Sequence, residues 1–410
     1  MARRNARRAA IRRAALLALV ATGLFLASWI AWQITPDGSF ARNLSGLVLS
    51  AAVTATTAFV AATMATRNAM RQRSEHDTIK ALESSSRSAS VQLGPLEIPD
   101  IVIYSIADGS APTASFRFPE ALSEPRQDPT EWAELQKTLL PDLVSRSEAS
   151  KRLFTDDPAV DMIAAAQQVH PQGQGTERVS WHVQFAETSY YKFAVLANST
   201  PDELRAHLPD AEPLLAERAV GRARLGELVT TRIPAKVGTG TVVQTSDGFL
   251  VGMIRGDTYQ IGDDASGIRK VHILGEGMLP TDVRDGRIDP KAAAWRGLYE
   301  ELGSSFGEAK VEFTGMFFDL RRHQPTFCYL ATIGVTFATL QTEFLTARDH
   351  WETDELVRLG PGVDDDLRRL MLGRQKTLRM ASNPGVMTLI LALGRLHGFR
   401  EVREAFAGEL

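Results

Sequence analysis

Two long uncharged runs near the N-terminus constrain this chain of 410 residues more than any other feature. Residues 14–34 and 43–66 contain no charged side chain, and a short polar segment with Pro, Asp and Gly separates them. A helix rises about 1.5 Å per residue, so either run would be long enough to span a hydrocarbon layer of about 30 Å. The pattern predicts a two-helix transmembrane hairpin over residues 14–66, with the lipid bilayer as a partner.

Arginines are concentrated around the two runs. Residues 1–73 contain ten Arg, no Lys and one acid, whereas the whole chain carries a net charge of −3. Six of these arginines lie in the basic segment 1–13 and three follow the second run. Positive charge favours the cytoplasmic side, so a two-pass protein of the bacterial inner membrane with both termini in the cytoplasm is predicted. The overall charge argues against nucleic acid as a partner.

Two other interpretations of the runs stay open. An Arg-rich start followed by an apolar run is also typical of a cleaved signal peptide, although the second run directly behind the first disfavours it. Both runs could instead be buried helices of a soluble fold, but neither has the polar face that such a helix shows.

The one cysteine, Cys328, excludes an intrachain disulfide and is expected in a core, because its neighbours are Phe327 and Tyr329.

The rest of the chain divides into three stretches. Residues 67–90 are polar and rich in serine, as is typical of a linker. Residues 91–234 form an intermediate α+β region without a chemical motif, and residues 235–410 show strand signals and glycines. The patterns of the intermediate region predict strands over 96–104 and 183–191 and helices over 131–144, 156–168 and 201–228.

A predicted helix over residues 290–302 carries the strongest chemical signal. Asp289 and Pro290 are typical of a helix start, and Gly303 is typical of a helix end. The helical spacing places one set of residues on an apolar face (Trp295, Leu298 and Leu302) and another on the opposite face (Arg296, Gly297, Glu300 and Glu301). Adjacent carboxylates repel each other, so a divalent cation such as Mg²⁺ is their natural partner. A solvated helix face is the alternative explanation.

Residues 296–304, Arg-Gly-Leu-Tyr-Glu-Glu-Leu-Gly-Ser, resemble the signature helix of the Nudix family, R-E-U-x-E-E-x-G-U. They match it at the arginine, the apolar position, both glutamates and the glycine, and the resemblance extends over roughly 235–359. It implies that Glu300 and Glu301 are catalytic residues that hold Mg²⁺, and that Arg296 orients them through a salt bridge. The fold class is then α/β: a transmembrane hairpin, the α+β region and a C-terminal Nudix-like α/β/α sandwich.

The predicted helix departs from the family pattern at Gly297, where the family has a glutamate. The usual spacing also puts Ile288 and Asp282 where the family has Glu and Gly. Glu276 is a candidate replacement for the missing carboxylate and hence a third metal ligand. Three later acids are further candidates: Glu312, Glu352 and Glu355. The triple Asp364-Asp365-Asp366 lacks the spacing of a calcium loop and predicts a helix start instead.

The order of the segments resembles that of the two-transmembrane Nudix effectors of bacterial CBASS anti-phage systems. This resemblance implies a receptor that binds a nucleotide second messenger, a cyclic oligonucleotide, and then assembles as a homo-oligomer that disrupts the membrane. The missing carboxylate at position 297 favours binding over turnover. The alternative is a membrane-tethered, Mg²⁺-dependent Nudix hydrolase of a nucleoside diphosphate derivative, and a third hypothesis is a structural membrane anchor.

Overall fold

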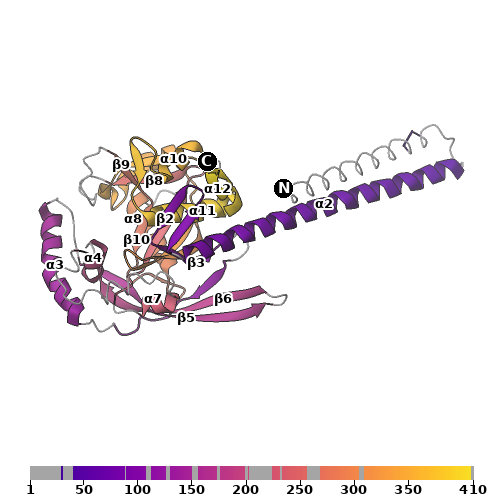
Figure 1. Cartoon of the computed structure of the whole chain (residues 1–410). Coiled ribbons are helices and arrows are strands. Elements are labelled where there is room, and N and C mark those ends of the chain that lie inside the picture. The colour runs from indigo at the N-terminus through magenta and orange to yellow at the C-terminus, as the bar shows by residue number, and fades with distance from the viewer. Residues whose placement is uncertain are drawn as a thin grey trace. The chain divides into compact units, whose positions relative to one another are not determined.

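The computed structural model divides the chain into two compact units, Met1–Ser74 and Glu75–Leu410. The residues that it describes are 29–30, 40–87, 89–107, 112–125, 130–149, 156–172, 176–198, 202, 224–230, 233–255, 268–303 and 309–407. Figure 1 labels their helices and strands. The second unit contains every described strand, and the only long described element of the first unit is the beginning of α2.

The helix α2, Phe40–Ser86, includes the whole of the predicted second membrane run. Among the described residues, no helix is long and apolar enough to cross a membrane. The physical reason lies in the composition of residues 43–66, which hold eight large apolar side chains against seven Ala, five Thr and two Ser. The first predicted run, 14–34, lies outside the described residues except for 29 and 30. The predicted transmembrane hairpin and the two-pass inner-membrane location are therefore corrected.

The last turns of α2 belong to the second unit. Ile79 and Leu82 are buried in its core, and the hydroxyl of Ser86 accepts a hydrogen bond of 3.0 Å from the backbone N–H of Ile103. The stretch 67–90, expected to be a linker, is thus helical as far as Ser86. Tertiary packing accounts for its last turns, because burial of apolar side chains such as Ile79 and Leu82 stabilises a helix more than its intrinsic propensity does.

A nine-stranded sheet forms the centre of the second unit. Its strands follow the order β16-β9-β8-β7-β14-β13-β3, while β10 pairs with β7 and β15 pairs with β8. Their bounds are β3 Ile101–Ile106, β7 Gly238–Gln244, β8 Leu250–Arg255, β9 Arg269–His272, β10 Leu274–Gly277, β13 Lys310–Asp319, β14 Gln324–Thr332, β15 Thr353–Leu359 and β16 Leu378–Met380.

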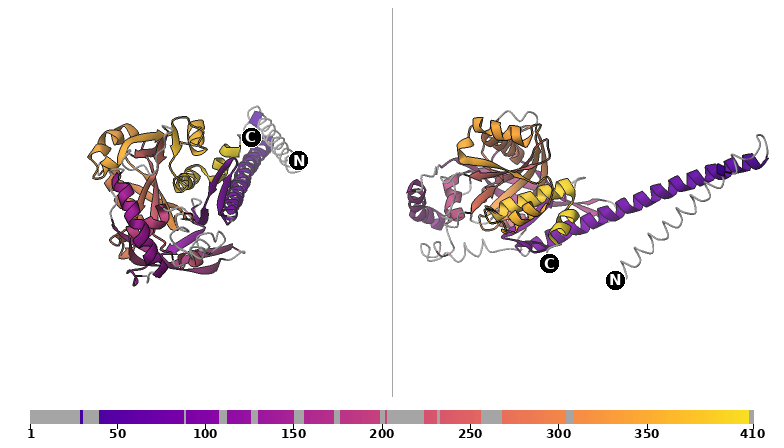
Figure 2. Two further views of the ribbon diagram at one scale, coloured as in Figure 1. Left: turned by 60° about the vertical axis from the view of Figure 1, so that its left-hand side comes forward. Right: turned by 90° about the horizontal axis from the view of Figure 1, so that it is seen from above.

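Helices cover both faces of this sheet. Neighbouring residues of its strands alternate between two hydrophobic clusters, because successive side chains of a strand point to opposite faces. Val243 and Phe327 face the helix α8, Pro290–Leu302, whereas Val242 and Cys328 face α11, Asn383–His397. The helix α12, Phe399–Ala407, packs against α11, as Figure 2 shows in yellow. Cys328 is buried, as predicted.

The intermediate region joins the same unit. It contributes β3 to the sheet and a long hairpin of β5, Pro158–Gln172, and β6, Thr176–Ser189, with β4, Ala114–Arg117, beside β6. The hairpin shares backbone hydrogen bonds with residues 235–237 and 278. Its helices are α3 Thr130–Ala149, α4 Tyr190–Asn198 and α7 Leu225–Val229. The remaining elements are β1 Ser90–Leu93, β2 Leu96–Pro99, β11 Val283–Arg284, β12 Arg287–Ile288, α9 Phe337–Glu343, η1 Phe344–Thr346, η2 His350–Glu352 and α10 Asp365–Met371.

One predicted helix of this region is wrong. Residues 156–168 fall mainly in β5, because pairing with β6 along the whole hairpin overrides the helical preference of its alanines. The predicted helix over 131–144 is confirmed by α3, and most of 201–228 lies outside the described residues. Asp364 begins α10, as predicted, and its carboxylate accepts a hydrogen bond of 2.8 Å from the backbone N–H of Leu367.

Candidate functional site

The helix α8 carries the predicted site residues Arg296, Glu300 and Glu301 and has the predicted bounds. The Asp289 carboxylate accepts a hydrogen bond of 2.8 Å from the Lys291 N–H, and Pro290 is the first helical residue. Gly303 ends the helix with a φ of 87°, a left-handed value that favours glycine. The buried face differs from the predicted one: Leu298 and Leu302 are buried as predicted and Trp295 is half-buried, whereas Gly297 and Glu301, predicted on the opposite face, are buried.

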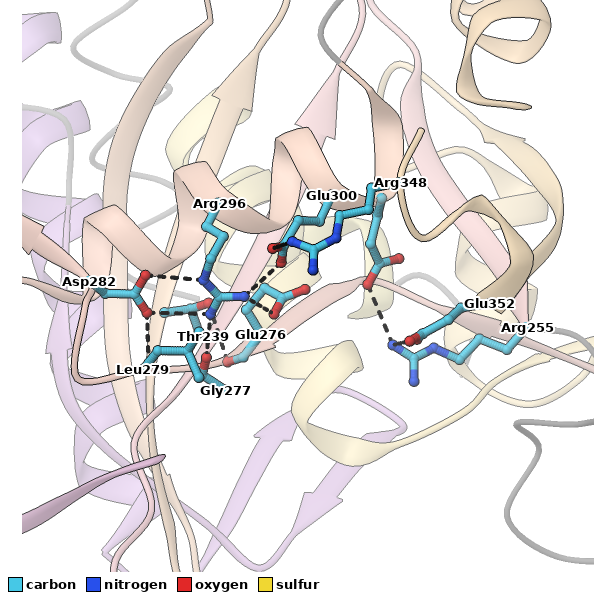
Figure 3. Close-up of polar contacts among 11 residues, drawn as sticks. Thr239, Arg255, Glu276, Gly277, Leu279, Asp282, Arg296, Glu300, Arg348 and Glu352 are labelled. Carbon is cyan, nitrogen blue, oxygen red and sulfur yellow. Dashed lines mark hydrogen bonds and ion pairs between the residues drawn. The ribbon is translucent and has the colours of Figure 1, made fainter. Parts of the chain in front are cut away.

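Arg296 is the centre of a charge network at the surface of α8 that faces β10. Its guanidinium donates hydrogen bonds to Glu300 at 2.7 Å, to Glu276 at 3.0 Å and to Asp282 at 3.1 Å. A further hydrogen bond of 2.6 Å goes to the carbonyl oxygen of Gly277. Figure 3 shows these groups converging on the guanidinium. The network joins α8 to β10 and to the loop that follows β10.

Glu276 occupies the space beside Gly297. A Cβ atom at position 297 would lie 2.3 Å from Cγ of Glu276 and 3.0 Å from a methyl carbon of Leu274. Atoms cannot approach so closely, so position 297 has no room for a side chain while Glu276 keeps its place. Glu276 of β10 thus fills the space that a side chain at position 297 would need, and its role as a replacement carboxylate stays a prediction.

Glu301 lies on the buried face of α8, with an exposed fraction of 3%. Its Oε1 is 3.5 Å from Nη2 of Arg255, and this nitrogen is also 3.7 Å from Oε2 of Glu352. Among the described residues, Oε2 of Glu301 has no hydrogen-bond partner. A buried polar atom in that state destabilises the fold, which makes it a candidate contact for a ligand.

Burial raises the pKa of two carboxyl groups at this site. The pKa of Glu276 rises to about 7, although the positive charge of Arg296 opposes the change. The pKa of Glu301 rises to about 8, against the effect of Arg255, and the negative charges of Glu276 and Glu352 contribute to the rise. Glu301 is therefore mostly protonated at neutral pH, and carboxyl groups perturbed in this way are concentrated at functional sites.

Lys236 approaches the network from the other side. Its buried ammonium group would lie 2.8 Å from a Cβ atom at Gly277, next to Glu276, and it is 4.6 Å from the ring centroid of Tyr190. Burial lowers the pKa of Lys236 to about 8, although the charge of Glu276 opposes the shift. Because Tyr190 begins α4, the intermediate region contributes to the surroundings of the site.

The other candidate acids lie in different contacts. Glu312 pairs with Arg395 and Lys310, and Glu355 pairs with Arg269. Among the proposed replacements, Glu276 binds Arg296 of α8, and Glu352 shares Arg255 with Glu301 of α8. Glu300, which also accepts a hydrogen bond of 3.1 Å from Arg348, faces the opposite side of Arg296 from Asp282.

The predicted magnesium ligands do not form a metal site in this arrangement. No group of three or more His, Cys, Asp or Glu side chains within the described part of the chain is placed to hold a metal ion. Glu276 and Glu300 both bind Arg296, whereas Glu301 faces Arg255. The present side-chain positions therefore do not fit Mg²⁺. The roles of Glu276, Glu300 and Glu301 as metal ligands, and of Arg296, Glu300 and Glu301 in catalysis, stay predictions.

Sequence reasoning missed the basic members of the site. In the sequence Arg255 is 46 residues from Glu301 and Arg348 is 48 residues from Glu300, and the fold brings each arginine to its partner. Asp282 was noted as a departure from the family pattern, and its role as a partner of Arg296 was not foreseen. Isolated arginines and acids have no sequence signature, so only the folded structure identifies them as members of the site.

Comparisons with known proteins identify no family for the chain. No family model matches it, and no curated protein matches it. Among solved structures, it is similar to the crystal structure of Tm1382, "a putative Nudix hydrolase", with 12% sequence identity and a TM-score of 0.26. The match covers 42% of this chain and 77% of that chain. At this level of similarity the Nudix assignment stays a prediction from residues 296–304.

Proposed function

We propose that the second unit binds a nucleotide at the network formed by Arg296, Glu276, Glu300 and Glu301. The observation that carries the proposal is the engagement of the site carboxylates by arginine. Arg296 holds Glu276 and Glu300, and Arg255 lies beside Glu301. These contacts leave a set of preorganised polar groups, which suits recognition of a polar ligand more than coordination of a catalytic metal.

The chemistry of the site matches both parts of a nucleotide. Guanidinium groups bind phosphate oxygens, and carboxyl groups bind the amino and imino groups of base edges. The oxygen of Glu301 that has no partner among the described residues is an acceptor or, when protonated, a donor for such a group. A ligand that binds it removes a cost of about 1–3 kcal/mol for a buried polar atom without a partner.

Cyclic di- and trinucleotides are the first ligands to test, because the sequence resemblance implied them. The same resemblance included the transmembrane hairpin, which the described helices do not support. A role in anti-phage defence therefore loses part of its support, and it is not included in the proposal.

A nucleotide hydrolase is the second candidate function. The observation that favours it is the pKa of Glu301, raised by burial to about 8, at a position where the resemblance puts a catalytic glutamate. Hydrolysis would require these carboxylates to leave their arginine partners. Hydrolysis and ligand binding without turnover are expected to differ in their response to Glu301→Gln.

Calorimetric titration of the full chain with cyclic di- and trinucleotides and with nucleoside di- and triphosphates tests the proposal. Glu301→Gln keeps the hydrogen-bonding atoms of the protonated acid, so it should bind like the parent protein within about twofold. Glu301→Leu removes those atoms and should weaken binding about tenfold or more. Glu355→Gln, which removes a surface charge outside the site, is the matched control.

Two outcomes would contradict the receptor function. Absence of binding to every nucleotide would remove the proposal altogether. Release of a nucleotide product by the parent protein with Mg²⁺, lost in Glu301→Gln although that variant still binds, would show that the chain is a hydrolase. Product analysis by chromatography on the same samples makes the comparison.

A further inference from the structure

The hairpin of β5 and β6 continues beyond the packed part of the second unit as an arm. Its three-stranded sheet has the order β4-β6-β5, so β5 is an edge strand of that sheet. The side chains of residues 166–170 are exposed, whereas Val160, Met162 and Ala165, nearer the start of β5, are buried. Figure 1 shows the two strands extending away from α4 and α7. The outer half of β5, residues 166–170, is therefore an exposed edge strand.

The edge of β5 is covered at its inner end. The backbone N–H groups of Val160 and Met162 each donate a hydrogen bond of 3.0 Å to a carbonyl oxygen outside the hairpin. The carbonyl oxygen of Ala165 faces α7, since a Cβ atom at Gly226 would lie 2.4 Å from it. Beyond Ala165, among the residues that the structure describes, no backbone hydrogen bond joins β5 to any element except β6.

The backbone groups of Gln167 and Val169 point to this open edge. In an antiparallel pair, residues whose N–H and C=O groups bond to the partner strand alternate with residues whose groups point away from it. The carbonyl of Ala165 points away from β6, toward α7. Gln167 and Val169 follow at alternate positions of the same strand, so their N–H and C=O groups also point away from β6. A further strand could bond to them there.

The outer half of β5 lacks the charges that usually protect an edge strand. Such strands carry charged side chains, prolines or bulges that prevent pairing with another chain. A bulge between Met162 and Ala164 and the proline Pro171 bound the open stretch, but residues 164–170 between them contain no Asp, Glu, Lys or Arg. Val169 also exposes 48% of its surface. A second copy of this strand would therefore meet no repulsion between these acidic and basic groups, and both copies would bury a valine.

We propose that the outer half of β5 pairs with the outer half of β5 of a second copy of this chain, which makes the protein a homodimer. The strands run antiparallel about a two-fold axis at Gln168, so Gln167 of each copy lies opposite Val169 of the other. Both residues point their backbone groups to the edge, and each pair therefore exchanges both of its hydrogen bonds. The two three-stranded sheets join into one sheet. A two-fold contact needs a surface that is complementary to itself, and this uncharged strand meets the requirement.

Disulfide cross-linking of the full chain tests the register. Gln168 lies at the two-fold axis, in a pair without hydrogen bonds between the copies, and the Cα atoms of such a pair are about 4.5 Å apart. A disulfide fits this distance, so Gln168→Cys should give a covalent dimer on mild oxidation. Gln92→Cys, at an exposed position of β1, is the control for random collisions and should give little. The native Cys328 is buried and does not interfere.

Sedimentation equilibrium of charge variants tests the same contact without a covalent bond. Gln167→Lys combined with Val169→Lys puts lysine opposite lysine and should weaken the dimer about tenfold or more. Gln167→Glu combined with Val169→Glu should do the same. An equimolar mixture of the two variants should associate again, because each lysine then lies opposite a glutamate. Gln92→Lys combined with Glu97→Gln adds the same charge as the two lysines, on β1 and β2, and should leave the dimer unchanged.

Three results would overturn the inference. The parent chain could sediment as a monomer at every concentration, or the variants at positions 167 and 169 could associate as tightly as the parent. Gln168→Cys could also form no more covalent dimer than Gln92→Cys. The mixture guards against misfolding, because two chains with damaged arms would not recover association when they are combined. Recovery in the mixture, together with the cross-link at position 168, supports pairing of the two β5 strands.

Discussion

Glu276 on β10 fills the space that a side chain at position 297 of α8 would need. Glycine in the middle of a helix costs about 1 kcal/mol relative to alanine, so this position is unfavourable for the helix by itself. The glycine at position 297 leaves the space in which the side chain of Glu276 lies, and Arg296 binds the carboxylate of Glu276 there. The helix propensity that α8 loses at Gly297 is thus coupled to the ion pair between Glu276 and Arg296.

Gly297→Ala should destabilise the protein by roughly 1–3 kcal/mol, because the new methyl group collides with Glu276. The double variant Gly297→Ala, Glu276→Gly should recover much of that loss, which a double-mutant cycle from urea denaturation would measure. Gly385→Ala in α11 is the control, since its nearest atom is 3.4 Å away. Additive effects of the two substitutions would contradict the proposed complementarity.

Glu301 should make stability depend on pH. Its pKa is raised by burial from 4.5 to about 8, so the folded protein binds the proton more tightly than the unfolded chain does. The stabilisation is complete below about pH 4.5 and is lost as pH rises through about 8, with an effect on the order of 5 kcal/mol. Glu301→Gln should flatten the stability profile between these limits in denaturation measured at several pH values. Parallel profiles for the two proteins would show that Glu301 titrates normally. The raised pKa of Glu276 acts in the same direction and stays in both proteins.

At the scale of elements, α8 is attached to the sheet by charge as well as by apolar packing. Arg296 binds Glu276 and the Gly277 carbonyl of β10, and it binds Asp282 beyond the strand. These partners are mostly buried, so they lose solvation on folding and depend on Arg296 for compensation. Removing one partner of a buried ion pair leaves an uncompensated charge.

Arg296→Gln should therefore destabilise the protein by about 3–5 kcal/mol in urea denaturation. Arg348→Gln is the matched control, because it also removes an arginine from Glu300. The Arg348 side chain is 76% exposed, so its loss should change the stability by less than about 1 kcal/mol. Similar effects of the two substitutions would mean that the Arg296 network adds no more than a surface ion pair.

At the scale of the whole molecule, α2 ends inside the second unit and is hydrogen-bonded to its C-terminal helix, α12. The carboxylate of Glu75 accepts hydrogen bonds from the backbone N–H groups of Phe399 and Arg400 at the start of α12, the latter at 3.0 Å. The first N–H groups of a helix lack partners within it, so Glu75 acts as a cap supplied from another element.

Glu75→Ala should increase hydrogen exchange at the amides of Phe399 and Arg400 and reduce stability by about 1 kcal/mol, the usual effect of losing a helix cap. Asp77→Ala removes an exposed acid two residues further along α2 and should leave both quantities unchanged. Unchanged exchange in Glu75→Ala would mean that α12 does not depend on α2.

Local chemistry in the sequence determined several elements of this protein. Asp289, Pro290 and Gly303 were enough to define α8, because capping groups and backbone conformation act within a few residues. Asp364 defined the start of α10 in the same way. The strands that the structure has between residues 238 and 332 agree with the strand signals of the stretch 235–410. The roles of the capped helix in binding or catalysis are still predictions.

Other features of the protein, among them the strand β5 and the contact of Glu276 with Gly297, were decided by the tertiary structure and could not be predicted from local sequence patterns. The two uncharged runs predicted membrane spans. Hydropathy, however, also depends on the size of the apolar side chains, and α2, with its many Ala and Thr residues, is too weakly apolar to cross a membrane. An Ala-rich stretch predicted a helix and became β5, because its long partner strand satisfies its backbone groups. The site itself depends on strand register, since pairing of Glu276 with Thr239 places its carboxylate over Gly297. A contact between residues 21 positions apart is set by that register, and no local pattern of residues determines it.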